Sequence, residues 1–188
     1  MTIMTILGSP RRYGNTAQVL EWIEEALRAE GHRIDRANIW EHQIGHCKES
    51  HQCRYPQSAA CGTPDDAAKL FERVLDADRV LIASPVFSWG FPAPMKALLD
   101  RFYCLSGYHQ DPDHAILLED KPIGLMMTCG GDETENYEIL SRVYRNMMAF
   151  FGARELGFWL IPRATTPEAL GDDVRRSAAE FAARLAAD

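Results

Sequence analysis

Short apolar runs alternate with amphipathic segments along the chain. The runs are brief, and the first is rich in β-branched residues, which predicts strands buried within a sheet. We expect strands at residues 2–7, 33–39, 79–84, 123–128 and 156–161. In the other segments apolar residues recur every three or four positions, which predicts helices with one buried face. We expect helices near residues 15–30, 63–76, 92–103, 137–151 and 167–187.

The strict alternation of strand and helix predicts an α/β fold, with a parallel sheet and helices on both of its faces. Right-handed crossovers leave few arrangements, and the strand order 2-1-3-4-5 is the common one for a chain of 188 residues. The irregular stretches 40–62 and 104–121 are expected to be loops of the same unit. We therefore expect residues 1–188 to form one domain.

Some helix details depend on single residues. Thr63 and Pro64 predict a helix start with Pro64 in the first turn. Tyr137 is expected to face the core, and Pro167 to open a closing helix that runs without a break to Ala187.

Composition sets bounds on function. Hydrophobic residues make up 46% of the chain, charged residues 25%, and the net charge is −7. An acidic chain without a basic run is a poor match to the phosphate backbone of nucleic acids. No apolar run is long enough to span a membrane, and the first residues lack the positive start of a signal peptide. We therefore expect a cytoplasmic protein that binds neither membranes nor nucleic acids.

The loop after the first expected strand has the residues of an anion site. Residues 8–16 (GSPRRYGNT) bring hydroxyls, an amide and guanidinium groups to the start of a helix. They match neither the G-x-x-x-x-G-K-[ST] loop nor the G-x-G-x-x-G loop, so a single phosphomonoester fits better than ATP or a dinucleotide. The alternative is a capped turn with surface arginines.

Two further strand ends carry unusual residues. Residues 84–92 (SPVFSWGFP) hold three aromatic side chains suited to a planar ring, with packing against a neighbouring subunit as the alternative. Residues 128–134 (TCGGDET) hold two glycines that let the backbone approach a ligand, unless they form an ordinary turn. All three loops belong to one edge of the predicted sheet. A phosphate pocket, an aromatic slot and a glycine edge together indicate flavin mononucleotide (FMN).

At these residues the chain resembles the NAD(P)H-dependent FMN reductase family of flavodoxin-like proteins. The matching segments are GSPR (8–11), GNT (14–16), ASPVF (83–87) and MKALLDRF (95–102). The resemblance implies a flavodoxin-like three-layer sandwich with bound FMN, assembled as a homodimer or homotetramer. It also implies transfer of two electrons from NAD(P)H to a flavin, quinone or other small acceptor. By position, it assigns cofactor binding to Ser9, Arg11, Asn15, Thr16, Pro85, Val86, Phe87, Ser88, Trp89, Gly90, Thr128, Gly130 and Gly131.

We expect FMN to carry the chemistry, so no side chain is assigned as a catalytic acid or base. Backbone amides at 88–90 are suited to stabilising the reduced, anionic flavin. Phe87 and Trp89, or an aromatic residue of a second subunit such as Tyr103 or Tyr108, are expected to close the pocket.

Three of the five cysteines, Cys47, Cys53 and Cys61, lie within fifteen residues. One branch of the family, the iron–sulfur flavoproteins, carries a compact four-cysteine motif in this loop, and here Ser50 stands where its second cysteine would be. Because a [4Fe–4S] cluster normally has four cysteine ligands, we expect no cluster, and instead a loop that lies over the flavin or at a subunit interface. We expect a solvated turn and no metal at residues 109–114 (HQDPDH). A zinc site is the alternative for the three thiols, with one histidine from His42, His46 and His51.

Other function classes stay open at this point. A flavodoxin-type electron carrier, or a flavin-binding regulator without turnover, would share the fold, but the pair Arg11 and Arg12 favours the reductase. A phosphatase of similar fold needs a nucleophilic cysteine in the first loop, where this chain has Ser9. The sequence favours neither NADH nor NADPH as the electron donor.

Overall fold

The computed structural model describes residues 1–50, 63–106 and 116–187. Its centre is a five-stranded parallel sheet in the order β2-β1-β3-β4-β5, which confirms the predicted topology. β2 and β5 are the two edge strands of this sheet. The strands are β1 (Thr2–Leu7), β2 (Arg33–Asn38), β3 (Arg79–Pro85), β4 (Pro122–Thr128) and β5 (Arg154–Ile161).

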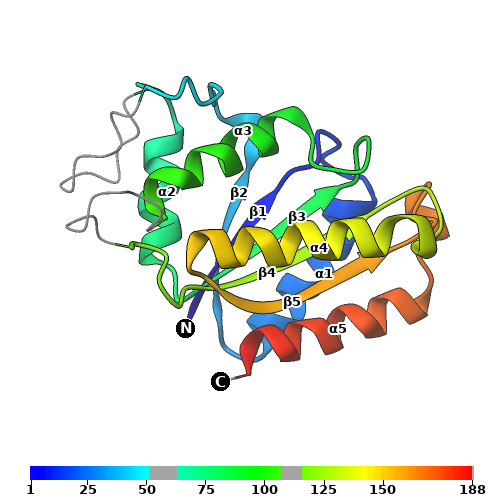
Figure 1. Ribbon diagram of the computed structural model, residues 1–188. Coiled ribbons are helices and arrows are strands. Elements are labelled where there is room, and N and C mark those ends of the chain that lie inside the picture. Colours follow the sequence, from blue (N-terminus) through cyan, green and yellow to red (C-terminus); the bar gives the residue numbers. More distant parts are fainter. Residues whose placement is uncertain (51–62, 107–115, 188) are drawn as a thin grey trace.

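Helices cover both faces of the sheet, which gives three layers (Figure 1). They are α1 (Asn15–Ala29), α2 (Ala67–Asp76), α3 (Ala93–Arg101), α4 (Glu133–Phe151) and α5 (Asp172–Ala186). Helices α1 and α5 pack side by side on one face, while α2, α3 and α4 share a hydrophobic core on the other. Three short 3-10 helices complete the described fold, η1 (Ile39–Glu41), η3 (Phe102–Leu105) and η4 (Pro167–Ala169).

The central strand β3 explains why its sequence is apolar without alternation. Val80 and Ile82 belong to the core under α2, α3 and α4, whereas Leu81 and Ala83 belong to the core under α1 and α5. Successive side chains of a strand point to opposite faces, so a strand covered on both faces needs apolar residues at every position. Burial of a Val, Leu or Ile side chain contributes about 1.5–3 kcal/mol when it leaves water.

The second helix begins later than predicted. Helix α2 starts at Ala67, and Pro64 lies before it. The carboxylate of Asp65 accepts the backbone N–H of Ala67 at 3.0 Å. This side chain satisfies a first-turn donor and places the helix start three residues after Pro64.

The closing helix is not continuous, which corrects the sequence prediction. Pro167 opens only the short helix η4, and α5 begins at Asp172 after Gly171. The carboxylates of Asp172 and Asp173 lie in the first turn of α5, where they complement the positive end of the helix dipole. These acidic residues favour a new helix start at Asp172 over one continuous helix from Pro167.

The orientation of Tyr137 also differs from the prediction. Helix α4 begins at Glu133, four residues earlier than expected, and the Tyr137 side chain is 44% exposed. Its ring packs against Phe158 of β5 with the ring centroids 5.4 Å apart. Because β5 is an edge strand, it leaves one side of the Tyr137 ring open to solvent. Within the described residues, no helix combines the length and the apolar character needed to span a membrane.

Candidate functional site

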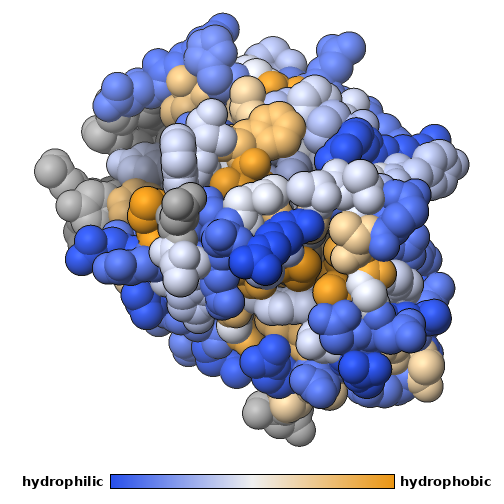
Figure 2. All heavy atoms as spheres, turned by 90° about the vertical axis from the view of Figure 1, so that its right-hand side faces the viewer, coloured by the Kyte–Doolittle hydropathy of each residue, from blue (hydrophilic) through white to orange (hydrophobic). Residues whose placement is uncertain are grey.

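The carboxyl ends of β1, β3 and β4 meet at one edge of the sheet, on the right-hand side of Figure 1. The chain order reverses at β1, because β2 lies on one side of β1 and β3 on the other. In open α/β sheets, a crevice at such a reversal takes ligands. Figure 2 looks onto this side of the molecule and shows apolar side chains gathered in its middle, between hydrophilic rims.

The turn between β1 and α1 buries three of its four predicted phosphate residues, Ser9, Asn15 and Thr16. Gly14 precedes the helix and offers no side chain to the first-turn N–H groups. These backbone donors of α1 therefore remain for a ligand, in the place where a phosphate is best stabilised.

Asn15 carries an unpaired buried atom. Its Nδ2 donates to the carbonyl of Ala164 at 2.5 Å. Its Oδ1 is buried and has no hydrogen-bond partner among the described residues. A buried acceptor without a donor costs about 1–3 kcal/mol, so a ligand hydroxyl that reaches this atom is stabilised by it. The ribityl chain of FMN carries such hydroxyls, and the crevice therefore fits the predicted cofactor.

Arg11, the fourth predicted phosphate residue, lies at the surface. Its backbone N–H donates to Ser9 Oγ at 3.2 Å, and the Ser9 hydroxyl donates to the Arg11 carbonyl at 3.3 Å. A Cβ atom at Gly14 would come within 2.9 Å of the Arg11 Cβ. Glycine at position 14 therefore lets Arg11 fold back over the turn.

Thr128, at the end of β4, joins all three predicted loops. Its carbonyl accepts the N–H of Val86 at 2.8 Å, next to the pairing of Thr128 with Pro85. Its hydroxyl lies 2.7 Å from the hydroxyl of Thr16, and both residues are buried. The phosphate turn, the aromatic loop and the glycine loop thus converge as predicted.

The aromatic loop contains a strained turn. Phe87 and Gly90 exchange two backbone hydrogen bonds of 3.0 and 2.9 Å, which closes the chain over Ser88 and Trp89. Both turn residues have positive φ, 46° for Ser88 and 57° for Trp89, a backbone region that favours glycine. Strain of this kind costs about 1–3 kcal/mol per residue and is typical of ligand sites. The turn holds the exposed rings of Phe87 and Trp89 at the rim of the crevice.

The glycine loop follows β4 at the surface. Its two glycines, Gly130 and Gly131, are exposed, and a Cβ at Gly131 would lie 3.2 Å from Asn136 Nδ2. Cys129 is buried beside them, and burial raises the pKa of its thiol. The thiol of Cys129 therefore stays protonated at neutral pH and is unsuited to act as a nucleophile.

Two residues that make hydrogen bonds at the crevice were not predicted from the sequence. One is Ala164, whose carbonyl orients Asn15 from the loop after β5. The other is Trp40, whose Nε1 donates to the Gly8 carbonyl at 2.9 Å. The predicted sheet order offered a signal for Ala164, because β5 ends at the same edge. Trp40 lies in a stretch without periodicity and gave no such signal.

The structure describes only one of the three clustered cysteines. Cys47 is exposed, whereas Cys53, Cys61 and the segment 109–114 lie outside the described residues. The same holds for His51 and Tyr108. Across residues 1–50, 63–106 and 116–187, no three His, Cys, Asp or Glu side chains are placed to hold a metal ion.

A groove of about 800 Å³ lies between α3 and α4, with Cys47 to Ser50 as part of its wall. Its apolar lining includes Phe91, Leu99, Met147 and Phe150. None of the residues assigned to the cofactor lines it. Phe91, the third aromatic residue of the loop 84–92, lies in this groove, so the groove borders the aromatic loop and only Phe87 and Trp89 stand at the rim of the crevice.

Buried Arg101 of α3 ties down the chain on both sides of the cysteine segment. Its guanidinium donates to the Gly45 carbonyl at 3.2 Å, the Thr63 carbonyl at 3.4 Å and the Asp65 carboxylate at 2.5 Å. Burial alone would raise the pKa of Asp65. Hydrogen bonds from Arg101 and from the N–H groups of Gly45 and Ala67 outweigh burial and lower this pKa below its ordinary value.

Comparison with known proteins identifies the family of the chain. The family model described as NADPH-dependent FMN reductase matches residues 1–162. An iron-sulfur flavoprotein of Archaeoglobus fulgidus is 26% identical over 190 residues, which cover 99% of this chain and 79% of that protein. An iron-sulfur flavoprotein of Methanosarcina thermophila is 27% identical over 157 residues, which cover 84% of this chain and 78% of that protein.

Solved structures share the fold at low identity. A flavone reductase superposes with a TM-score of 0.73 at 20% identity, over 99% of this chain and 62% of that longer chain. The NAD(P)H:quinone oxidoreductase of Methanothermobacter marburgensis superposes with a TM-score of 0.72 at 20% identity, over 98% and 94% of the two chains. The family match spans most of the chain, including all three loops of the crevice, and the chain therefore belongs to the NADPH-dependent FMN reductase family.

Proposed function

We propose that the chain is an FMN-dependent NAD(P)H oxidoreductase of the cytoplasm, acting as one domain over residues 1–188. It passes a hydride from the nicotinamide, by way of FMN, to a quinone, a flavin or another small acceptor. The observation that carries the proposal is the convergence of the three loops at Thr128. Membership of an FMN reductase family adds independent support.

The phosphate end of the cofactor is assigned to the turn before α1. The hydroxyls of Ser9 and Thr16 are buried there, beside the first-turn N–H groups of the helix. Asn15 contributes its backbone N–H to the phosphate, while its side-chain Oδ1 is assigned to a ribityl hydroxyl. Backbone donors and hydroxyls bind a phosphate without a nearby lysine. Arg11 folds over the turn from the surface and adds positive charge, which an acidic chain needs at an anion site.

The planar end is assigned to residues 85–90 and to the loop with Gly130 and Gly131. The turn's own hydrogen bonds occupy the amides of Phe87 and Gly90, which leaves those of Ser88 and Trp89 to face the polar edge of the ring. When bound, FMN supplies the two-electron transfer chemistry. The chain's part is to orient the ring, to stabilise negative charge with these amides and to limit water at the rim.

We also infer a homodimer formed through the outer side of α4. Ile139, Val143, Met147 and Phe150 form a stripe with spacings of four, four and three, and Ile139 is 49% exposed and Phe150 39% exposed. This spacing lets one helix pack against another. At the rim of the adjacent groove Lys96 and Asp100 pair with each other, so their charges do not oppose a second, identical copy.

The proposal is tested on the full chain saturated with FMN. We expect retained flavin and oxidation of NADH or NADPH with a quinone acceptor. Thr16→Val should weaken FMN binding about tenfold, because one hydrogen bond is worth about 0.5–1.5 kcal/mol. Thr2→Val, at the opposite end of β1, is the matched control and should bind FMN like the unmodified protein. Absence of flavin binding overturns the proposal, and a stable semiquinone on photoreduction without turnover favours the electron carrier.

A further inference from the structure

A second cavity opens at the same edge of the sheet, on the other side of β1. It measures about 490 Å³ and lies between α1 and the end of β2, and its lining includes Arg12, Tyr13 and Glu41. Leu7 and Asn38, the last residues of β1 and β2, line its base and pair with each other in the sheet. The cavity lies at the ends of β1 and β2, whereas the flavin crevice lies at the ends of β1, β3 and β4, so β1 borders both.

Helix η1 connects this cavity to the phosphate turn. Asn38 caps η1 by accepting the N–H of Trp40 at 3.3 Å, and its Nδ2 donates to the Glu41 carboxylate at 3.1 Å. Trp40 in turn donates to the carbonyl of Gly8. Glu41 is therefore held at the rim by the same short helix that contacts the phosphate turn.

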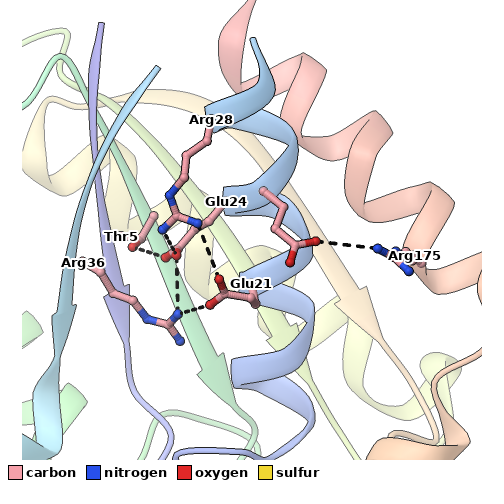
Figure 3. Close-up of polar contacts among 7 residues, drawn as sticks. Thr5, Glu21, Glu24, Arg28, Arg36 and Arg175 are labelled. Carbon is pink, nitrogen blue, oxygen red and sulfur yellow. Dashed lines mark hydrogen bonds and ion pairs between the residues drawn. The ribbon is translucent and has the colours of Figure 1, made fainter. Parts of the chain in front are cut away.

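An ion cluster around the buried carboxylate of Glu24 lies beside the cavity and includes one of its arginines (Figure 3). Glu24 is 0% exposed and accepts from the Thr5 hydroxyl at 2.6 Å and from Arg28 at 2.9 Å. Arg36, which lines the cavity, lies 2.6 Å from Glu21 and 3.4 Å from Glu24. Two carboxylates and two guanidinium groups balance in this cluster, so Arg36 offers no net positive charge to a ligand.

Among the described charged residues that line the cavity, Arg12 and Glu41 stand outside this cluster. A guanidinium suits a pyrophosphate. A carboxylate at the end of the second strand suits the hydroxyls of a ribose and repels a phosphate on the 2′ position. The ring of Tyr13 is 86% exposed and offers a face to a base.

We propose that this cavity binds the adenosine ribose of the electron donor, and that the donor is NADH in preference to NADPH. The inference rests on the proposed function, since the nicotinamide must lie at the flavin crevice. Glu41 accepts the ribose hydroxyls, Arg12 pairs with the pyrophosphate and Tyr13 packs on the adenine. A dinucleotide with its nicotinamide at the crevice reaches the cavity across β1.

The first test is calorimetric titration of the full FMN-loaded chain with ADP-ribose and with its 2′-phosphate. ADP-ribose should bind at least about tenfold more tightly, because the 2′-phosphate meets the carboxylate of Glu41. Glu41→Gln should weaken ADP-ribose binding about tenfold, as a hydrogen bond to a charged group is worth about 1.5–3 kcal/mol. It should also remove most of the discrimination. Tyr13→Ala should weaken both ligands.

The matched control is Glu180→Gln on the exposed surface of α5, which removes the same charge far from the cavity. It should bind ADP-ribose like the unmodified protein. Equal affinity for the two ligands, absence of binding, or unchanged affinity in Glu41→Gln and Tyr13→Ala each overturns the inference. Flavin content, measured by visible absorption before titration, reports separately on the proposed function.

Steady-state kinetics gives an independent measurement. In Glu41→Gln, kcat/KM for NADH should fall about tenfold further than kcat/KM for 1-benzyl-1,4-dihydronicotinamide, which lacks the adenosine half. Equal losses with the two donors would place the effect at the flavin and overturn the assignment of Glu41.

Discussion

The hydroxyls of Thr16 and Thr128 lie 2.7 Å apart, although 112 residues separate them in sequence. Both are buried, so each hydroxyl depends on the other for a partner that water supplies in the unfolded chain. This contact fixes the start of α1 against the end of β4, and with it the two sides of the crevice.

Thr16→Val and Thr128→Val should each lower the free energy of unfolding by about 1–3 kcal/mol, because each leaves a buried hydroxyl unpaired. The double variant should lose less than the sum of the single losses, since neither hydroxyl then remains without a partner. Urea denaturation of the four proteins measures this coupling. Additive losses would contradict a direct hydroxyl–hydroxyl contact.

Single residues of the site were predictable where they belong to a strand end. The turn 8–16 was predicted as an anion site from its hydroxyl, amide and guanidinium groups, and the family resemblance assigned Ser9, Asn15 and Thr16 within it. The structure buries these three residues, and their contact with the cofactor stays a prediction. Trp40 was not predicted, because it lies in a stretch without periodicity and its indole contact depends on tertiary distance alone. Ala164 was also missed, although the predicted sheet order brings the loop after β5 to this edge.

Arg101 of helix α3 joins separate segments of the chain, as Thr128 does at the crevice. The buried guanidinium reaches Gly45, Thr63 and Asp65, and so attaches two separate segments of chain to one helix. Removal of one partner from a buried ion pair lowers the free energy of unfolding by about 3–5 kcal/mol, because the other charge stays buried. The position of α2 depends on the same contact, since Asp65 also accepts the first N–H of that helix.

The ion pair of Asp65 and Arg101 should make the free energy of unfolding fall at acid pH. The pKa of Asp65 is lowered in the folded state from its unfolded value of about 3.9. Its stabilising effect is therefore complete above about pH 4 and is lost as the pH falls through the lower folded pKa. Asp65→Asn should flatten the decline in unfolding free energy below pH 4, as measured by denaturation at several pH values. Glu180→Gln, as a control, should keep the decline.

Helix boundaries were the least predictable feature at this scale. Pro64 is common in a first helical turn, yet Asp65 places the start of α2 at Ala67. Gly171 with two acids gives α5 its own start within what appeared to be one helix. In both cases two local signals lie a few residues apart, and packing decides which of them the chain uses.

The whole topology was predictable because alternation and handedness restrict it strongly. Five strands separated by helices allow few right-handed parallel sheets, and the observed order is the expected one. The groove between α3 and α4 was not predictable in the same way. Apolar residues on the outer side of α4 form one wall of this groove. In the sequence they alternate with the apolar residues of α4 that face the core, so the pattern did not separate the two sets.

Replacement of Ile139 by Glu should convert the inferred homodimer to a monomer. The change places a charge in the apolar stripe, where a second copy would bury it. Sedimentation equilibrium measures the mass, and far-UV circular dichroism confirms that the fold persists. Ala179→Glu adds the same charge to the exposed surface of α5 and should leave the dimer intact. A monomeric unmodified protein, or a dimeric Ile139→Glu protein, would contradict the inferred interface.

The edge strand β2 has a consequence for the behaviour of the protein at high concentration. Open sheet edges can recruit a strand of another chain and so begin aggregation. β2 carries Arg33, Asp35 and Arg36 along this edge, and Asp35 is bonded to Arg73 of α2 at 2.7 Å. Charges fixed along an edge strand make strand addition costly. Addition of a foreign strand at the β2 edge is thereby disfavoured, which should keep the protein dispersed at concentrations where an uncharged edge would begin to aggregate.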